Sequence, residues 1–270
     1  MTGGSGGFDD LSGAGTPGIV PPPSGVRTVP PRSSLATHLV LVRHGEAVCN
    51  LSGVCGGRIG CEGLTDRGRH QVEALRDRLL ATGELADADA LYASILPRAI
   101  ETAELLAPAL AARGTDGEPG PIPPVGVDCG LCELHPGEAD GLTWDVFSER
   151  FAAIDWDVDP GQPIAPGGES WTGFVNRVSA TLDVLAARHP GQLVVAACHA
   201  GVVEASLLAK LPVAGGLAGA RLQLRTRHAS MTSWEIEGEH WRLLAYNDAE
   251  PVDGTTAGPA RSRATHAQQA

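Results

Sequence analysis

Continuous apolar runs and helically spaced apolar positions alternate along the chain. Residues 39–42 (Leu-Val-Leu-Val) and 193–197 (Leu-Val-Val-Ala-Ala) are apolar throughout, which predicts strands buried on both faces. Further strands are predicted at 90–94, 125–132, 220–225, 230–236 and 240–246. Helices are predicted from Thr65, over 97–113, near 143–153, from Glu169 to just before Pro190, and over 202–211. This alternation indicates an α/β fold of three layers, with a mostly parallel central sheet and helices on both faces.

The two ends of the chain differ from this middle part. Residues 1–36 and 251–270 are rich in Gly, Pro, Ser and other residues that bury little apolar surface, so we expect both segments to be disordered. One folded domain is therefore predicted over residues 37–250. Inside it, residues 47–64 form a polar, glycine-rich stretch predicted to be a loop, and its length suggests a functional role.

Composition narrows the range of functions. The 270 residues include 43% apolar side chains and carry a net charge of −12, which argues against a nucleic-acid or anionic-membrane binder. No apolar stretch approaches the ~20 residues of a membrane span. A signal peptide has a basic start and an apolar centre, and the first residues show neither. We therefore expect a cytoplasmic protein.

Six cysteines raise the questions of disulfides and of a metal site. Without an export signal, free thiols are expected. Cys129 and Cys132 have the CxxC spacing of zinc sites, but a second CxxC or an HxxxH segment is missing. The sequence thus predicts neither a metal site nor a cofactor.

Charged residues and imidazoles follow several predicted strands. Arg43 and His44 follow the first strand and His199 follows the strand at 193–198, so parallel strands would place both histidines at one sheet edge. Arg98 and Glu133 follow two other strands. Such a cationic pocket with one acid suits a small phosphorylated substrate: arginines neutralise the phosphoryl oxygens, a histidine attacks, and the acid protonates the leaving oxygen.

The motifs around these residues resemble the histidine phosphatase superfamily, also called the phosphoglycerate-mutase-like family. The resemblance covers about residues 38–248. The matching segments are Arg43-His44-Gly45-Glu46, Asn50, Gly63-Leu64-Thr65-Asp66-Arg67-Gly68, Arg98-Ala99-Ile100-Glu101-Thr102-Ala103, Glu133 with Gly141-Leu142-Thr143, Gly167-Gly168-Glu169-Ser170, and His199-Ala200-Gly201.

The resemblance implies a phosphatase that hydrolyses a phosphomonoester through a phosphohistidine, without a metal. His44 would be the nucleophile and Glu133 the general acid and then the base, with Glu138 as a competing candidate for the acid. The phosphoryl group would be bound by Arg43, Asn50, Arg98 and His199. The other histidines are expected to be solvated or structural.

Two rival functions stay open at this point. A phosphoglycerate-type mutase would carry a Glu-Arg-His-Tyr-Gly segment, whereas this chain has Glu-Leu-His-Pro-Gly over 133–137, so hydrolysis is favoured. A non-catalytic protein that binds phosphorylated ligands is disfavoured, because every residue that the reaction needs is present. Gly56 stands where the family commonly has a glutamine. The sequence indicates neither the substrate nor the oligomeric state.

Overall fold

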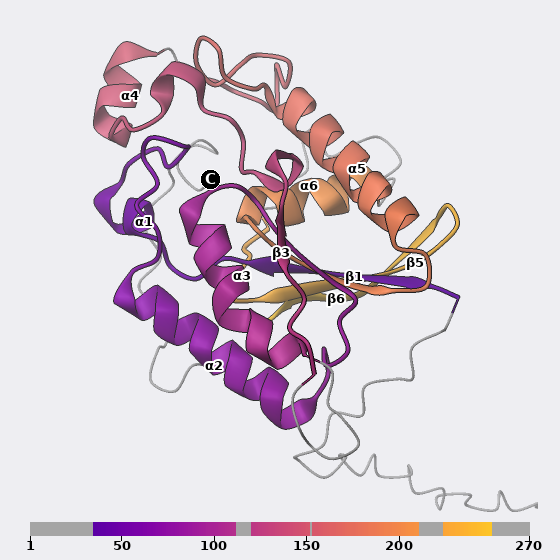
Figure 1. Ribbon diagram of the computed structural model, residues 1–270. Coiled ribbons are helices and arrows are strands. Elements are labelled where there is room, and N and C mark those ends of the chain that lie inside the picture. Colours follow the sequence, from indigo (N-terminus) through magenta and orange to yellow (C-terminus); the bar gives the residue numbers. More distant parts are fainter. Residues whose placement is uncertain (1–34, 112–119, 152, 211–223, 250–270) are drawn as a thin grey trace, which may run out of the picture. The chain divides into compact units, whose positions relative to one another are not determined.

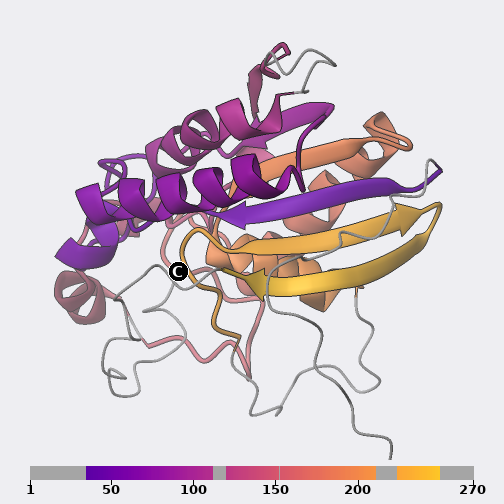
Figure 2. The same cartoon turned by 90° about the horizontal axis from the view of Figure 1, so that it is seen from below.

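A six-stranded mixed sheet, in the order β3-β2-β4-β1-β5-β6, forms the middle layer of the fold. The computed structural model describes residues 35–111, 120–151, 153–210 and 224–249. The strands are β1 (Thr37–Arg43), β2 (Ala90–Ala93), β3 (Val125–Val127), β4 (Leu193–Cys198), β5 (Met231–Glu237) and β6 (His240–Asp248). Strands β1 to β4 run parallel, whereas β5 and β6 form an antiparallel hairpin beside β1 (Figure 2).

Helices cover both faces of this sheet. They are α1 (Val48–Ser52), α2 (Asp66–Thr82), α3 (Pro97–Leu110), α4 (Trp144–Arg150), α5 (Trp171–Arg188) and α6 (Ala200–Lys210), with short 3-10 helices η1 (Cys129–Leu131) and η2 (Gly137–Ala139). In Figure 1 the sheet is seen nearly edge-on, with α2 and α3 on one side and α5 and α6 on the other. The predicted three-layer α/β fold is confirmed.

Alternation along β1 explains why both faces are covered. Val40 and Val42 pack into a core with α2 and α3, whereas Leu39 and Leu41 pack into a second core with α5 and α6. Successive strand residues point to opposite faces, so a continuous apolar run requires apolar partners on both sides. The core residue Trp234 on β5 extends the second layer.

Three local predictions were wrong. The stretch at 47–64, predicted to be a loop, contains the helix α1. Ala47 is the N-cap of this helix, and its backbone N–H donates to the side-chain oxygen of Asn50. The strand predicted over 125–132 ends at Val127, because the Asp128 carboxylate accepts from the Gly130 N–H and starts η1. The helix predicted from Glu169 begins at Trp171, after Ser170 as its N-cap.

The remaining boundary predictions fall partly beyond the described residues. Of the segments predicted to be disordered, only residues 35 and 36 are described, and the strand predicted at 220–225 overlaps only residues 224 and 225, which form no strand. The disorder and the domain limits therefore stay predictions. Among the helices in the described part of the chain, none is long and apolar enough to cross a membrane.

Candidate active site

The candidate active site lies at the sheet edge where β1 and β4 end. In this parallel pair Arg43 is in register with Cys198, so His44 and His199 each lie one residue beyond the paired strands. The His44 N–H donates to the Cys198 carbonyl at 3.0 Å, and the two imidazole rings meet edge to face with centroids 5.1 Å apart. The sequence prediction that these two histidines come together is confirmed by the geometry.

Hydrogen bonds define which nitrogen of His44 is free to react. Nδ1 lies 2.6 Å from the Gly45 carbonyl oxygen, which can only accept, so Nδ1 carries the hydrogen. Nε2 accepts from Arg98 Nε at 3.1 Å and therefore holds a lone pair. The ring is buried, with 3% of its surface exposed. His44 thus presents an unprotonated Nε2, the form that a nucleophile needs.

His199 uses its two nitrogens in the opposite way. Its Nδ1 accepts from Arg98 Nε at 3.2 Å, so Nε2 carries the hydrogen and donates to Ser94 Oγ at 2.7 Å. Ser94 follows β2, the strand next to β4, and is fully buried. The Ser94 hydroxyl thereby fixes the orientation of the His199 ring.

Arg98 connects the two histidines to the loop after β1. It lies in the first turn of α3, which begins at Pro97. While Nε contacts both imidazoles, Nη1 donates to the Gly56 carbonyl at 2.6 Å. A Cβ on Gly56 would lie 2.5 Å from Cys49 Sγ, so the chain has no room for a side chain there without moving Cys49. This close approach gives a physical reason for the glycine at position 56.

Burial and nearby cations keep both imidazoles neutral. Burial lowers the pKa of His44 well below its ordinary value, and the guanidinium of Arg98 lowers it further. The pKa of His199 is lowered in the same way by burial, then by Arg98 and Arg43. Burial also lowers the pKa of Arg43 to about 10, so its guanidinium is charged at pH 7. The site therefore combines neutral nitrogen bases with fixed positive charge.

Two polar atoms beside these rings are buried without a hydrogen-bond partner. Arg43 donates through Nη1 to the Thr226 carbonyl, but its Nε is unpaired. Nε2 of His228 is also unpaired, and its ring lies 5.8 Å from that of His44. An unpaired buried polar group is unfavourable, so a polar ligand or a water molecule beside these rings would stabilise both atoms.

His228 is a residue that the sequence interpretation missed. It was expected to be solvated or structural, yet burial and the neighbouring cations lower its pKa to about 2. The missed signal is topological: β5 runs antiparallel to β1, so the turn before β5 lies where β1 ends. The Ala229 N–H donates to the Arg43 carbonyl at 3.0 Å and holds this turn against the site.

The carboxyl group of Glu133 contacts the first turn of α6. Its Oε2 accepts from the Gly201 N–H and its Oε1 from the Leu134 N–H, both at 3.1 Å. A Cβ on Gly201 would lie 2.1 Å from Oε1, so this glycine lets the carboxyl group approach the helix. Next along α6, Glu204 has its pKa raised to about 7 by burial and by Glu133. Glu138, the competing acid, is exposed on η2.

Asn50, Cys198 and Cys49 differ in their burial and in their contacts with the site. Asn50 is exposed, and its side-chain oxygen accepts from the Ala47 N–H at 2.9 Å, so its role in phosphate binding stays a prediction. Cys198 is fully buried in the core with α5 and α6. Cys49 instead contacts the site, because its Sγ lies 3.9 Å from Arg98 Nη1.

A separate groove lies at the opposite end of the sheet. It has a volume of about 700 Å³ and lies beside Thr37, the first residue of β1, and Ile236 and Trp241 of the β5-β6 hairpin. None of the residues predicted for catalysis lines it. The candidate chemistry therefore belongs to the edge where β1 ends.

The sequence matches a known protein family and several of its members. The sequence profile of the histidine phosphatase superfamily (branch 1) matches residues 39–249. The metal-independent phosphoserine phosphatase of Arabidopsis thaliana is 31% identical over 182 residues, which cover 65% of this chain and 69% of that protein. Phosphoglycerate mutase-like protein 4 of the same plant is 27% identical and covers 80% of this chain and 87% of its own.

Solved structures show the same fold. The mycobacterial glucosyl-3-phosphoglycerate phosphatase, in a complex with VO3, has a TM-score of 0.59 and 28% identity, and covers 78% of this chain and 99% of its own. The chain belongs to the histidine phosphatase superfamily. Within it, the protein is an enzyme of the phosphoric monoester hydrolase class.

Proposed function

We propose that this enzyme hydrolyses a small phosphomonoester through a phosphohistidine on His44, with Glu133 as general acid and base. The observation that carries the proposal is the unprotonated Nε2 of His44, held by the Gly45 carbonyl on one side and Arg98 on the other. The guanidinium groups of Arg43 and Arg98 would bind the phosphoryl oxygens, together with His199 and Asn50.

In the first step, the lone pair on His44 Nε2 attacks phosphorus. The ester P–O bond breaks, and the leaving oxygen takes a proton from the carboxylic acid of Glu133. The Gly45 carbonyl accepts from Nδ1–H and stabilises the positive charge that develops on the ring. Arg98 Nε, which contacts His44 Nε2 at 3.1 Å, must turn from the ring towards a phosphoryl oxygen.

In the second step, water attacks the phosphorus of the phosphohistidine. Its proton passes to the Glu133 carboxylate, the P–N bond breaks, and the electron pair returns to Nε2. Phosphate leaves, and Glu133 is again a carboxylic acid. One residue thus serves both steps, and the hydrogen bond that it accepts from the Gly201 N–H holds it at the N-terminus of α6, two residues after His199.

The substrate class follows from the relatives more than from the site. Two of them are named for phosphoserine and for glucosyl-3-phosphoglycerate, both phosphomonoesters that carry a carboxylate. We infer a substrate with a carboxylate near the phosphate ester. Arg58, exposed on the loop after β1, is a candidate for contact with that second anion.

Turnover of p-nitrophenyl phosphate and of a phosphometabolite panel tests the proposal. The wild type should release phosphate, with the highest kcat/KM for carboxylate-bearing esters, and His44→Ala should release none above background. Activity that survives in His44→Ala would overturn the mechanism. Interconversion of phosphoglycerates that outpaces phosphate release would identify a mutase instead.

A further inference from the structure

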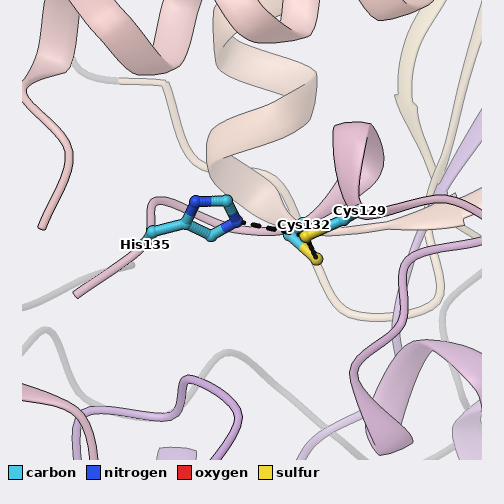
Figure 3. Close-up of side chains that lie close together, drawn as sticks. All are labelled: Cys129, Cys132 and His135. Carbon is cyan, nitrogen blue, oxygen red and sulfur yellow. Dashed lines mark hydrogen bonds between the residues drawn. The ribbon is translucent and has the colours of Figure 1, made fainter. Parts of the chain in front are cut away.

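We propose that Cys129, Cys132 and His135 form a binding site for one thiophilic metal ion such as Zn²⁺, apart from the reacting residues. The three side chains offer two sulfurs and one imidazole nitrogen, all within 4.8 Å of one another. Figure 3 shows the His135 ring directed at the two cysteines. Sulfur and imidazole ligands together are typical of zinc sites.

The spacing of the ligand atoms suits a tetrahedral ion. Cys129 Sγ lies 3.3 Å from Cys132 Sγ and 3.4 Å from His135 Nε2. Around zinc, with bonds of about 2.3 Å to sulfur and 2.0–2.1 Å to nitrogen, tetrahedral ligands are about 3.8 Å and 3.6 Å apart. These two separations need shifts of a few tenths of an ångström to admit the ion, and the third, between Cys132 Sγ and His135 Nε2, is within 4.8 Å.

The imidazole is oriented as a metal ligand would be. Glu169 Oε2 accepts from the backbone N–H of His135 at 2.9 Å and lies 3.5 Å from its Nδ1. With a carboxylate beside Nδ1, the other ring nitrogen, Nε2, is the one that can bind the metal. Many metal-bound histidines have this arrangement. Nε2 is the atom that contacts Cys129 Sγ.

The backbone that carries both cysteines is held from α5. Arg177 Nη1 donates to the carbonyls of Cys129, Gly130 and Cys132 at 2.9–3.2 Å. The same guanidinium donates to both carboxylate oxygens of Glu169 at 2.7 Å. One ion pair thus fixes the cysteine turn and the carboxylate that orients His135. A site whose three ligands share one rigid support needs little reorganisation when the ion binds.

Access to the site and its open coordination position are consistent with exchange of the ion. Cys132 is buried, whereas Cys129 is half-buried and the His135 side chain is 42% exposed. With three protein ligands, a tetrahedral ion keeps one position for water or an external ligand. The ion would bind next to Glu133, which follows Cys132 in the chain, but the mechanism above assigns it no step.

Cobalt binding by the reduced, metal-free full-length protein tests this site. We expect one equivalent of Co²⁺, with thiolate-to-cobalt charge-transfer absorption and tetrahedral visible bands that disappear when Zn²⁺ displaces cobalt. Cys129→Ser and His135→Ala should each weaken Zn²⁺ binding by at least about tenfold in competition with a chromophoric chelator. Cys132→Ser provides a second thiol variant in case one of them folds poorly.

Cys55→Ser is the matched control, because Cys55 is a buried free thiol outside the ligand set and packs in a different hydrophobic cluster from Cys132. It should keep one equivalent of cobalt with the same spectrum. The proposal would be overturned by cobalt binding without thiolate absorption, by affinity unchanged in His135→Ala, or by loss of binding in Cys55→Ser. Because metal binding is read without substrate, failure here would leave the proposed hydrolysis untouched, and the reverse also holds.

Discussion

His44 and His199 occupy equivalent places in the sheet but present opposite nitrogens. Each follows one of two paired parallel strands, and each accepts from the same Arg98 Nε. The Gly45 carbonyl takes the hydrogen of His44 Nδ1, whereas Ser94 takes that of His199 Nε2. His44 therefore offers Nε2, the nitrogen farther from the backbone. Local acceptors, more than strand position, therefore decide which nitrogen of each histidine carries no hydrogen.

Removing each histidine should separate their roles most strongly. His44→Ala should lower kcat/KM by on the order of 10⁶, as loss of a covalent nucleophile does. His199→Ala should lower it by roughly 10²–10³, as loss of one group that stabilises the transition state does. Phosphate-release assays on both variants measure this, with the exposed His70→Ala as control. Equal losses in the two variants would refute the distinction.

Glu133→Gln should show a loss that depends on the leaving group. With an alkyl phosphate, loss of the general acid should reduce kcat/KM by roughly 10²–10⁴. With p-nitrophenyl phosphate the loss should be smaller, because nitrophenolate leaves without a proton. Glu138→Gln, the exposed competitor, should behave as the wild type with both substrates. A large effect of Glu138→Gln together with a small one of Glu133→Gln would reverse the assignment.

Ser94→Ala should disturb His199 while leaving His44 in place. The buried Nε2–H of His199 would lose its acceptor, a penalty of about 1–3 kcal/mol that corresponds to roughly 5- to 150-fold in kcat/KM. Steady-state kinetics measure this effect. Ser206→Ala is the matched control, since its buried hydroxyl donates to the Val203 carbonyl within α6. Wild-type kinetics in Ser94→Ala would show that this hydrogen bond does not hold the ring in its working orientation.

Acid should destabilise the fold through the imidazoles whose pKa values are lowered in the folded state. His44, His199 and His228 have lowered pKa values in the folded state, so below about pH 6.5 the unfolded chain binds protons that the folded chain does not. The free energy of unfolding should then fall with decreasing pH by about 1.4 kcal/mol per unit for each fully titrating histidine.

The variant His228→Asn isolates the contribution of one histidine to the pH dependence of the free energy of unfolding. Urea denaturation at several pH values below about 6.5 should show a slope shallower than the wild type's by up to about 1.4 kcal/mol per pH unit. An identical slope in the variant would mean that His228 is not buried as a neutral ring.

Much of the fold could be predicted because β1 and β4 are continuous apolar runs. A parallel pairing of such strands also places His44 and His199 together, so the centre of the site follows from sequence. Arg98 and Glu133 are predicted in the same way, from their places after other strands, although the strand before Glu133 ends at Val127. The local acceptors of the two rings could not be predicted, since they depend on the positions of Gly45 and Ser94 in space.

Features that depend on long-range packing escaped the sequence interpretation. His228 enters the site only because β5 pairs antiparallel with β1. His135 was set aside as solvated or structural, and the CxxC pair was judged to lack further ligands. The ion pair between Glu169 and Arg177, from a distant helix, aligns that ring with Cys129. The Cys-x-x-Cys-x-x-His spacing over 129–135 is visible in the sequence, but the contact that orients the ring is not.

Rapid-quench phosphorylation is the most direct test of the central claim. Enzyme mixed with phosphate-labelled substrate and quenched in alkali should carry an acid-labile phosphoryl group, and peptide mass analysis should place it on His44. NMR of the intact phosphoenzyme should identify the N–P bond at Nε2. The label should be absent in His44→Ala and should accumulate in Glu133→Gln if dephosphorylation becomes limiting. A label on His199, or turnover without any phosphoenzyme in single-turnover experiments, would contradict the account.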